Sequence, residues 1–287
     1  MTTGTTQDFN LDRNSLITMA YRKIGITANS TLISQGADVL NMILREEDLY
    51  GTGPSRNLWA ITESTLKLSA GGYVYSTTEG LESAILDLAA VFYRNASGDD
   101  TEVKIIDSQQ YEQISDKDSD GDVESVYLKP NLSLSSQLLY VWPAPSSVGT
   151  TSEVTGTDAL NYSCIMGHTS ASADRPITGA NWRLYWRQTG TSGSTWVTGT
   201  SYTNGELLRY LYKRPLYDFD TSTDNPDMPS GWVRYLTFRL AHDLCPEFDV
   251  DMESRGWLKR EYLEARMILF NSARPLTNDI HNKTVFY

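Results

Sequence analysis

The chain has 287 residues, 40% of them hydrophobic and 11% aromatic, which is enough for one large domain or two smaller ones. Its formal net charge is −12 and its Lys and Arg residues are scattered, which argues against tight binding to a nucleic-acid backbone. No run of about 18 apolar residues occurs and the first residues lack a signal-peptide pattern, so we expect no transmembrane helix and a short disordered lead.

Two helices are predicted near the N-terminus. In residues 12–24, Leu16, Ala20 and Ile24 recur at helical spacing, and Gly25 is placed to end the helix. Residues 34–49 are predicted to form the second helix, with its apolar side chains facing inward.

The middle of the chain reads mainly as strands. Residues 59–68 and 73–75 have strand character, whereas Leu81, Ile85, Leu88 and Phe92 form one helical stripe that predicts a third helix over 79–94. The remaining predicted elements are strands at 103–106, 123–128 and 138–142 and a short helix at 108–114.

A stretch of different composition separates the strand at 138–142 from a similar one at 207–214. Residues 146–206 are rich in Ser, Thr and Gly and hold three of the seven Trp. We therefore predict that two neighbouring strands of one sheet are separated by an inserted all-β module at 146–206. Residues 1–145 and 207–287 would then be the two parts of one core.

Two further helices are predicted after an acidic loop at 218–227, one over 231–245 and the other over 251–274. Neither the N-terminal nor the C-terminal pair of helices has enough partners alone, so the two pairs must pack on each other. The predicted fold class is α+β: a helical bundle of N- and C-terminal helices with a small antiparallel β-sheet and the inserted all-β module.

Little in the sequence points to catalysis. The P-loop, Gly-x-Ser-x-Gly and Gly-x-Gly-x-x-Gly motifs are absent, and Cys164 and Cys245 are interpreted as unpaired thiols in a reducing compartment. His242 is interpreted as a structural or interface residue, because a neighbour at i+1, here Asp243, should face away on a helix. We predict no catalytic residue, no metal site and no cofactor.

One acidic segment partly matches a calcium-binding loop. Asp116, Asp118 and Asp120, followed by Gly121, have the spacing of its first half, but Tyr127 stands where a bidentate Glu is needed. We favour a solvated acidic turn, and whether these three Asp bind a cation stays open.

The other acidic groups have plain interpretations. The carboxylates of 218–227 suit a loop before a helix, whose N-terminus favours negative charge. Glu46 and Glu47, at the end of the second predicted helix, are interpreted as a solvated face.

Aromatic side chains of the insert are the candidates for recognition. Trp196, Tyr202 and Tyr185 lie among small polar residues, and such aromatic faces can stack on sugars or anchor an interface. In so small a module Trp residues can instead form the core, which we expect of Trp182 and Trp186.

Most of residues 10–145 and 207–270 resembles the head-to-tail adaptors of short-tailed phages, the tail accessory and packaged-DNA-stabilisation protein group. The segments that carry the resemblance, in order, are 16–26, 57–59, 66–71, 115–122, 126–128, 140–145, 212–220, 226–229 and the helix that begins at Trp232. The insert departs from this pattern and resembles a small β module of various phage structural proteins, with 161–165, 168–170, Pro176, Gly179 and 181–182 as its marks.

The resemblance implies a non-enzymatic protein of the virion neck, assembled in the host cytoplasm. Such adaptors form a ring of about twelve copies under the portal protein, extend the DNA channel and receive the tail tube or nozzle. An acidic channel wall lets packaged DNA pass without tight binding, and no membrane partner is expected.

The C-terminal tip supplies the expected interface. Val285, Phe286 and Tyr287, with Ile280, would bind a neighbouring subunit or the portal and become ordered on assembly. The alternative function is a glycan-binding or cell-wall-degrading virion protein that uses residues 146–206 for recognition.

Overall fold

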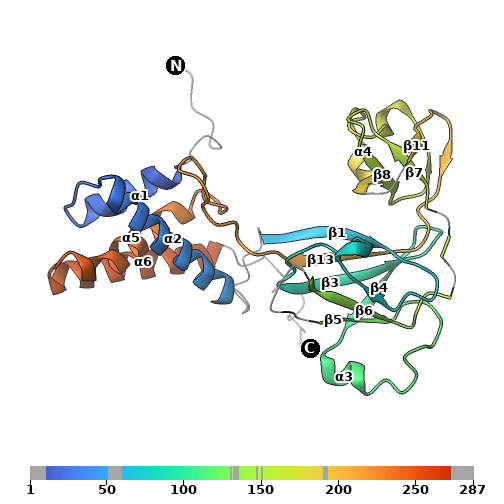
Figure 1. The fold of residues 1–287 in the computed structure, drawn as a ribbon, viewed down its shortest axis with the longest axis horizontal. Coiled ribbons are helices and arrows are strands. Elements are labelled where there is room, and N and C mark those ends of the chain that lie inside the picture. Colours follow the sequence, from blue (N-terminus) through green and yellow to red (C-terminus); the bar gives the residue numbers. More distant parts are fainter. Residues whose placement is uncertain are drawn as a thin grey trace, which may run out of the picture. The chain divides into compact units, whose positions relative to one another are not determined.

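A computed structural model describes residues 11–50, 60–129, 131, 136–146, 148–149, 151–189 and 193–272. The chain forms two compact units (Figure 1). Residues 1–60 and 215–287 make the first, which we call the helical unit, and residues 61–214 make the second, the sheet unit.

The helical unit packs helices from both ends of the chain around one core. Its helices are α1 (Arg13–Lys23), α2 (Ser30–Tyr50), α5 (Trp232–Leu244) and α6 (Met252–Ser272), with a 3-10 turn at Cys245–Glu247 after α5. Leu16, Leu40, Leu240 and Leu258, one from each helix, are buried in the same cluster. The prediction that the N- and C-terminal helices pack on each other is therefore confirmed.

The sheet unit is built on seven strands, with a 3-10 turn at Thr77–Glu79 and one short helix, α3 (Ser108–Glu112). The strands are β1 (Ile61–Lys67), β2 (Val74–Tyr75), β3 (Asp87–Arg94), β4 (Asp100–Ile105), β5 (Ser125–Lys129), β6 (Leu138–Trp142) and β13 (Leu207–Lys213). Their order is β1-β13-β3-β4-β5-β6-β2, antiparallel except for the parallel pair β4 and β5.

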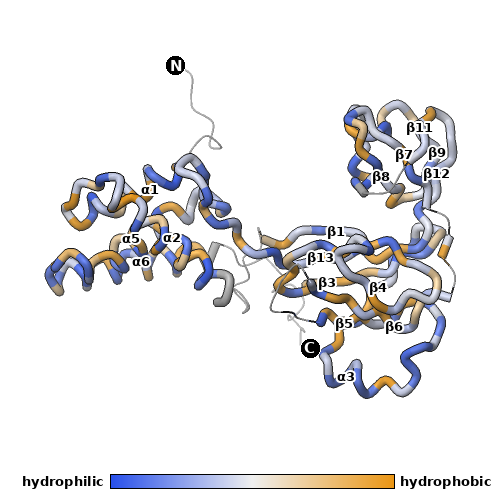
Figure 2. The backbone as a smooth tube through the Cα atoms, viewed as in Figure 1, coloured by the Kyte–Doolittle hydropathy of each residue, from blue (hydrophilic) through white to orange (hydrophobic). Residues whose placement is uncertain are grey.

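The core of this sheet lies on one of its faces and takes alternate residues from most strands, among them Leu66, Val91, Val141 and Leu208. Figure 2 shows that the segment around α3 is largely hydrophilic, in contrast to these strands. Tyr111 of α3 packs against Tyr140 of β6, with ring centroids 5.0 Å apart, which holds the short helix to the strands.

The predicted helical bundle with a small sheet is wrong, because the sheet is large and curled and the third predicted helix does not exist. Residues 87–94 instead form β3, between β13 and β4. Gly80 (φ 96°) and Ala84 (φ 59°) both take left-handed backbone that interrupts a helix. Pairing with strands on both sides then decides the structure of a segment whose apolar spacing also suited a helix.

The two strands on either side of the insert are not neighbours. β6 and β13 belong to the same sheet, but β3, β4 and β5 lie between them. β13 instead pairs with β1 and β3, because the chain leaves the sheet from β6 near one edge and returns beside β1, the strand at the opposite edge. The prediction of adjacent strands is therefore corrected.

The insert is mainly β but also holds a one-turn helix, α4 (Trp182–Tyr185), and a 3-10 turn at Ser172–Asp174. Its strands are β7 (Glu153–Thr155), β8 (Asn161–Cys164), β9 (His168–Thr169), β10 (Trp186–Thr189), β11 (Ser194–Thr195) and β12 (Ser201–Tyr202). They form a four-stranded sheet, β10-β8-β7-β11, and a two-stranded sheet, β12-β9, over a separate small core.

Arg94 of β3 joins the insert to the large sheet. Its guanidinium makes a bidentate pair with Asp100 at 2.7 and 2.8 Å, and its Nη1 donates to the carbonyl oxygen of Ile165 in the insert at 2.7 Å. Arg209 of β13 contacts Asp100 as well and also pairs with Glu63 at 2.8 Å. The hydrogen bonds from Arg94 hold the pKa of Asp100 below its ordinary value.

Candidate functional site

Among the described residues, Cys164 and His168 are a cysteine and a histidine that lie close together, but their geometry does not suit catalysis. The Sγ of Cys164 lies 3.9 Å from the Nδ1 of His168, and both atoms instead contact the carbonyl oxygen of Met166, at 3.1 and 2.9 Å. Burial raises the pKa of the Cys164 thiol to about 12, so the thiolate that a nucleophile requires does not form near neutral pH.

His242 belongs to a partly exposed cluster of ionisable side chains in the helical unit. Its Nδ1 lies 2.9 Å from Asp243, so the expectation that Asp243 faces away is wrong. Asp243 also accepts from Arg239 at 2.6 Å, and Arg239 reaches Glu46 of α2 at 2.9 Å.

Glu47, the residue after Glu46 in α2, is buried and has a different set of partners. It is only 4% exposed, so its interpretation as part of a solvated face is wrong. Tyr235 of α5 donates a short hydrogen bond to it, and Arg266 of α6 contacts it at 3.2 Å. Burial, and then the charge of Glu47, raises the pKa of Tyr235 above its ordinary value. A carboxylate thus ties three helices together.

Two carboxylates of the acidic loop at 218–227 accept hydrogen bonds from main-chain nitrogens. Asp224 accepts from the backbone nitrogens of Asp220 and Thr221, at 2.8 and 2.6 Å, and Asp227 accepts from that of Tyr217. In the segment that begins at Asp116, the carbonyl oxygen of Asp116 accepts from the indole of Trp142 at 2.8 Å, and Lys117 pairs with Glu112 at 3.3 Å. Over the described ranges, no three His, Cys, Asp or Glu side chains are grouped as a metal ion would require.

The aromatic side chains of the insert lie mainly against one another. Tyr202 is 6% exposed and belongs to the core, where its ring lies 4.9 Å from that of Trp186, so it is not a surface recognition residue. Tyr185 is half-buried with its ring 4.1 Å from that of His168. The expectation of a core role is confirmed for Trp186, and Trp182 packs against the same core.

Trp196 is also half-buried against the insert core, and the Arg175 guanidinium lies 5.7 Å from its ring. The most exposed large apolar side chains of the insert are aliphatic, Leu184 at 60% and Val197 at 53%. Of the three predicted recognition residues, the structure therefore leaves Trp196 and Tyr185 partly exposed and buries Tyr202.

The strongest surface feature of the helical unit is the outer side of α6, which the sequence analysis missed. The inward side of this helix buries Leu258, Tyr262 and Ala265. Its outward side carries four further large apolar residues, which we call the outer face of α6: Met252 (82% exposed), Met267 (61%), Ile268 (53%) and Leu263 (40%). Trp257 is also 40% exposed, but its ring packs against Phe238 of α5. The signal was present in the sequence as apolar residues outside the single inward stripe.

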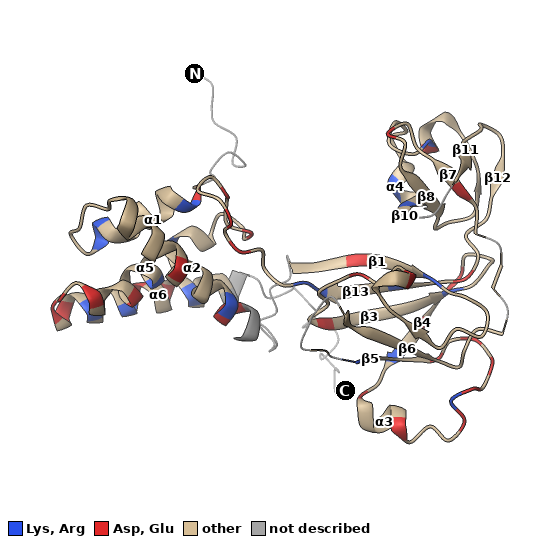
Figure 3. Cartoon of the chain, in the orientation of Figure 1, with Lys and Arg blue, Asp and Glu red and all other residues tan. Residues whose placement is uncertain are grey.

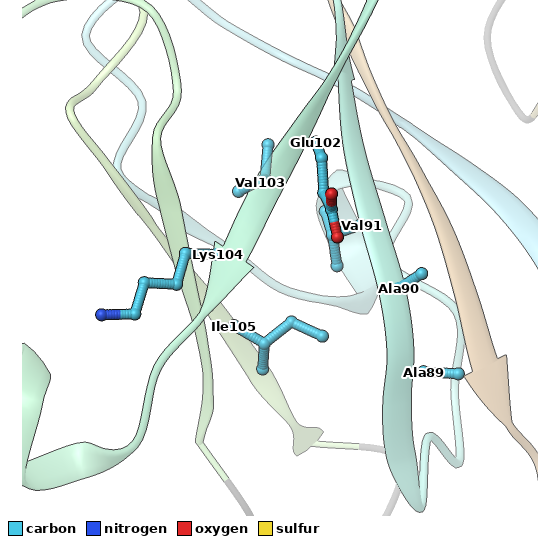
Figure 4. A pocket seen from close by; sticks show the side chains of 7 residues that line it. All are labelled: Ala89, Ala90, Val91, Glu102, Val103, Lys104 and Ile105. Atoms are coloured by element: carbon cyan, nitrogen blue, oxygen red, sulfur yellow. The ribbon is translucent and has the colours of Figure 1, made fainter. Parts of the chain in front are cut away.

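A second surface feature is a cleft of about 420 Å³ between β3 and β4 (Figure 4). It is lined by Ala89, Ala90, Val91 and the stretch from Glu102 to Ile105. The two strands pair only at Val91–Arg94 with Asp100–Val103, after which β4 leaves β3 and pairs with β5. We call this opening the β3–β4 cleft.

The C-terminal candidates Ile280, Val285, Phe286 and Tyr287 lie outside the described residues. Among the residues that are described, no helix combines the length and apolar character needed to cross a bilayer. No protein-family model matches this sequence, and no curated protein matches it either.

Proposed function

We propose that the chain is a structural head-to-tail adaptor of a tailed bacteriophage. In this role it forms a ring under the portal protein, extends the DNA channel and attaches the tail. The proposal rests on the ordered resemblance of the segments described above and on one observation of the fold, the outer face of α6.

A surface helix of a self-sufficient protein has one apolar side and one polar side. α6 has apolar residues on both, and exposed apolar surface of this kind is typical of a protein that binds a partner. In a ring each copy presents the same surfaces to its neighbours, so a repeated interface can cover the outer face of α6 in every copy.

The distribution of charge supports passage of DNA without tight binding. Lys and Arg are interspersed with Asp and Glu over both units (Figure 3), and the formal net charge is −12. Because phosphate binding requires clustered cations, such a surface lets DNA slide past instead of holding it.

The test is to mix the purified chain with portal rings and to image the mixture by electron cryomicroscopy. We expect a ring of the chain on one end of the portal, and a monomeric or weakly associated chain without portal. A double substitution, Leu263→Glu with Met267→Glu, should prevent the ring while leaving circular dichroism unchanged, because both side chains are exposed in the single chain.

Glu264→Gln on the same exposed turn of α6 is the matched control and should assemble as the unaltered chain does. A chain that ignores portal rings would contradict the proposed function. Normal assembly of the double variant would show that the outer face of α6 is not the ring interface.

A further inference from the structure

The β3–β4 cleft exposes part of a strand edge in the interior of the sheet order. On one side, β3 pairs along its length with β13, with a register shift between Leu211 and Tyr212. On the other, among the described residues, Asp87 to Ala90 of β3 have no strand partner. An open edge of this kind offers backbone N–H and C=O groups to an added strand.

The walls of the cleft combine apolar side chains with the charged residues Glu102 and Lys104. Val91 and Val103 close its narrow end, where the two strands pair, and Ile105 is 39% exposed where they separate. Figure 4 shows the Ile105 side chain in the space between the strands, whereas Lys104 points away from it. Ala89 and Ala90 are small, so the wall formed by β3 leaves room for a large incoming side chain.

We propose that residues 284–287 of a second copy of this chain occupy the β3–β4 cleft as an added strand. This proposal rests on the proposed function, because the ring places a second copy of the chain beside the first. It gives the apolar C-terminal tip a defined receptor within the ring.

The match between segment and cleft has three parts. Thr284, Val285, Phe286 and Tyr287 are all residues that favour extended strands. Four residues also equal the open edge from Asp87 to Ala90 in length. The preceding Lys283 is cationic, and Glu102 supplies the opposite charge at the cleft.

The first experiment tests the contact without requiring a ring. The full chain carrying Val285→Asp and Phe286→Asp is mixed with a synthetic peptide of residues 280–287, and amide hydrogen exchange is followed. We expect saturable binding that slows exchange among the amides of Asp87 to Ala90 by about tenfold or more. A peptide with the same two Asp substitutions should produce no change.

Cleft variants show whether the peptide binds where we propose. Ile105→Glu should weaken peptide binding by about tenfold, because it places a charge on the apolar wall. Thr101→Glu, at an exposed position of β4 outside the cleft, should leave binding unchanged. Absence of saturable binding and of exchange protection, or equal binding to the Ile105→Glu chain, would overturn the proposal.

The second experiment asks which copy supplies the segment. One preparation carries Ala90→Cys and another carries Phe286→Cys; the native Cys164 and Cys245 are both buried and should stay unreactive. Mixed with portal and oxidised, the two should give a disulfide-linked pair of chains on a non-reducing gel. A disulfide only within a chain that carries both substitutions would overturn the second copy as the occupant.

The two proposals fail in different ways. Rings seen by microscopy without peptide binding or cross-linking would leave the adaptor function standing and remove the cleft contact. If the peptide protects the cleft but no ring forms on the portal, the cleft contact would stand and the adaptor function would be contradicted.

Discussion

The helical unit and the sheet unit both contain an arginine–carboxylate network, but they place it differently. In the helical unit Glu47 is buried where α2, α5 and α6 meet, and its partner Tyr235 is 188 residues away in sequence. In the sheet unit Asp100 is partly exposed, and Arg94 spans from it to the insert. The Glu47 network joins three helices to one another, whereas the Asp100 network joins the insert to the large sheet.

The largest effect on stability should follow from removal of the buried Glu47 carboxylate in the helical unit. Glu47→Ala leaves Arg266 and Tyr235 without their shared acceptor, and we expect it to lower the free energy of unfolding of this unit by about 3 to 5 kcal/mol. Urea unfolding followed by hydrogen exchange of α5 amides measures this change. Glu46→Ala, next to it but largely exposed, should cost far less; an equal cost would mean that burial is not the cause.

A smaller effect is expected where the insert meets the sheet. Arg94→Met removes the bidentate contact to Asp100 and the bond to Ile165, and should cost about 2 kcal/mol, because hydrogen bonds to charged groups contribute about 1.5 to 3. The loss should appear first as faster proteolysis within the insert. Lys67→Met, which removes an exposed ion pair with Glu153, is the control and should leave the cleavage rate nearly unchanged.

The same site predicts a dependence on pH. Because folding lowers the pKa of Asp100, its contribution to stability is fully present above its unfolded pKa of about 3.9 and is lost as pH falls through the lower folded value. The sheet unit should therefore lose stability in this acid range, with a shallower slope in the Arg94→Met chain. Equal slopes for the two chains would contradict this assignment.

Helix capping should give the next effect in size. Asp12 accepts from the backbone nitrogen of Ser15 at 2.7 Å at the start of α1, and Asp12→Ala should cost about 1 kcal/mol. Thermal unfolding of the helical unit measures it. Asp38→Ala, at an exposed position within α2, tests whether loss of any carboxylate would do the same.

The smallest effect on stability is expected on the outer face of α6. Met267→Ala should change the free energy of unfolding by no more than about 0.5 kcal/mol, because the side chain is 61% exposed. It should nevertheless weaken ring formation, as measured by mass photometry in the presence of portal. A large loss of stability with normal assembly would reverse the roles assigned to the two sides of α6.

Local patterns were sufficient to predict much of the helical unit. α1, α5 and α6 each follow one apolar stripe with a recognisable start or stop, and these signals lie within a few turns of chain. The same kind of stripe misled the prediction for 79–94. Val91 and Tyr93 belong to a strand only because they pair with β4 and with β13, and β13 is distant in sequence.

Burial that depends on distant partners could not be predicted in the same way. Glu47 has the composition of a solvated helix end, and its burial is decided by Tyr235 and Arg266 far along the chain. Tyr202 looked like a surface aromatic because its neighbours are small and polar, yet its ring completes the insert core. The interface roles of Trp196, Tyr185 and the C-terminal tip stay predictions.

The path of the chain through the two units sets an order for biosynthesis. The sheet unit is a continuous stretch, whereas the helical unit is interrupted between Ala60 and Pro215. At ordinary translation rates of about 5 to 20 residues per second, Glu47 emerges roughly 10 to 40 s before Tyr235 exists. For that interval α1 and α2 lack the helices that cover them. Termination of translation between β13 and α5 should therefore leave a complete sheet and two uncovered helices, so we expect α1 and α2 to be the part of the nascent chain most in need of a chaperone.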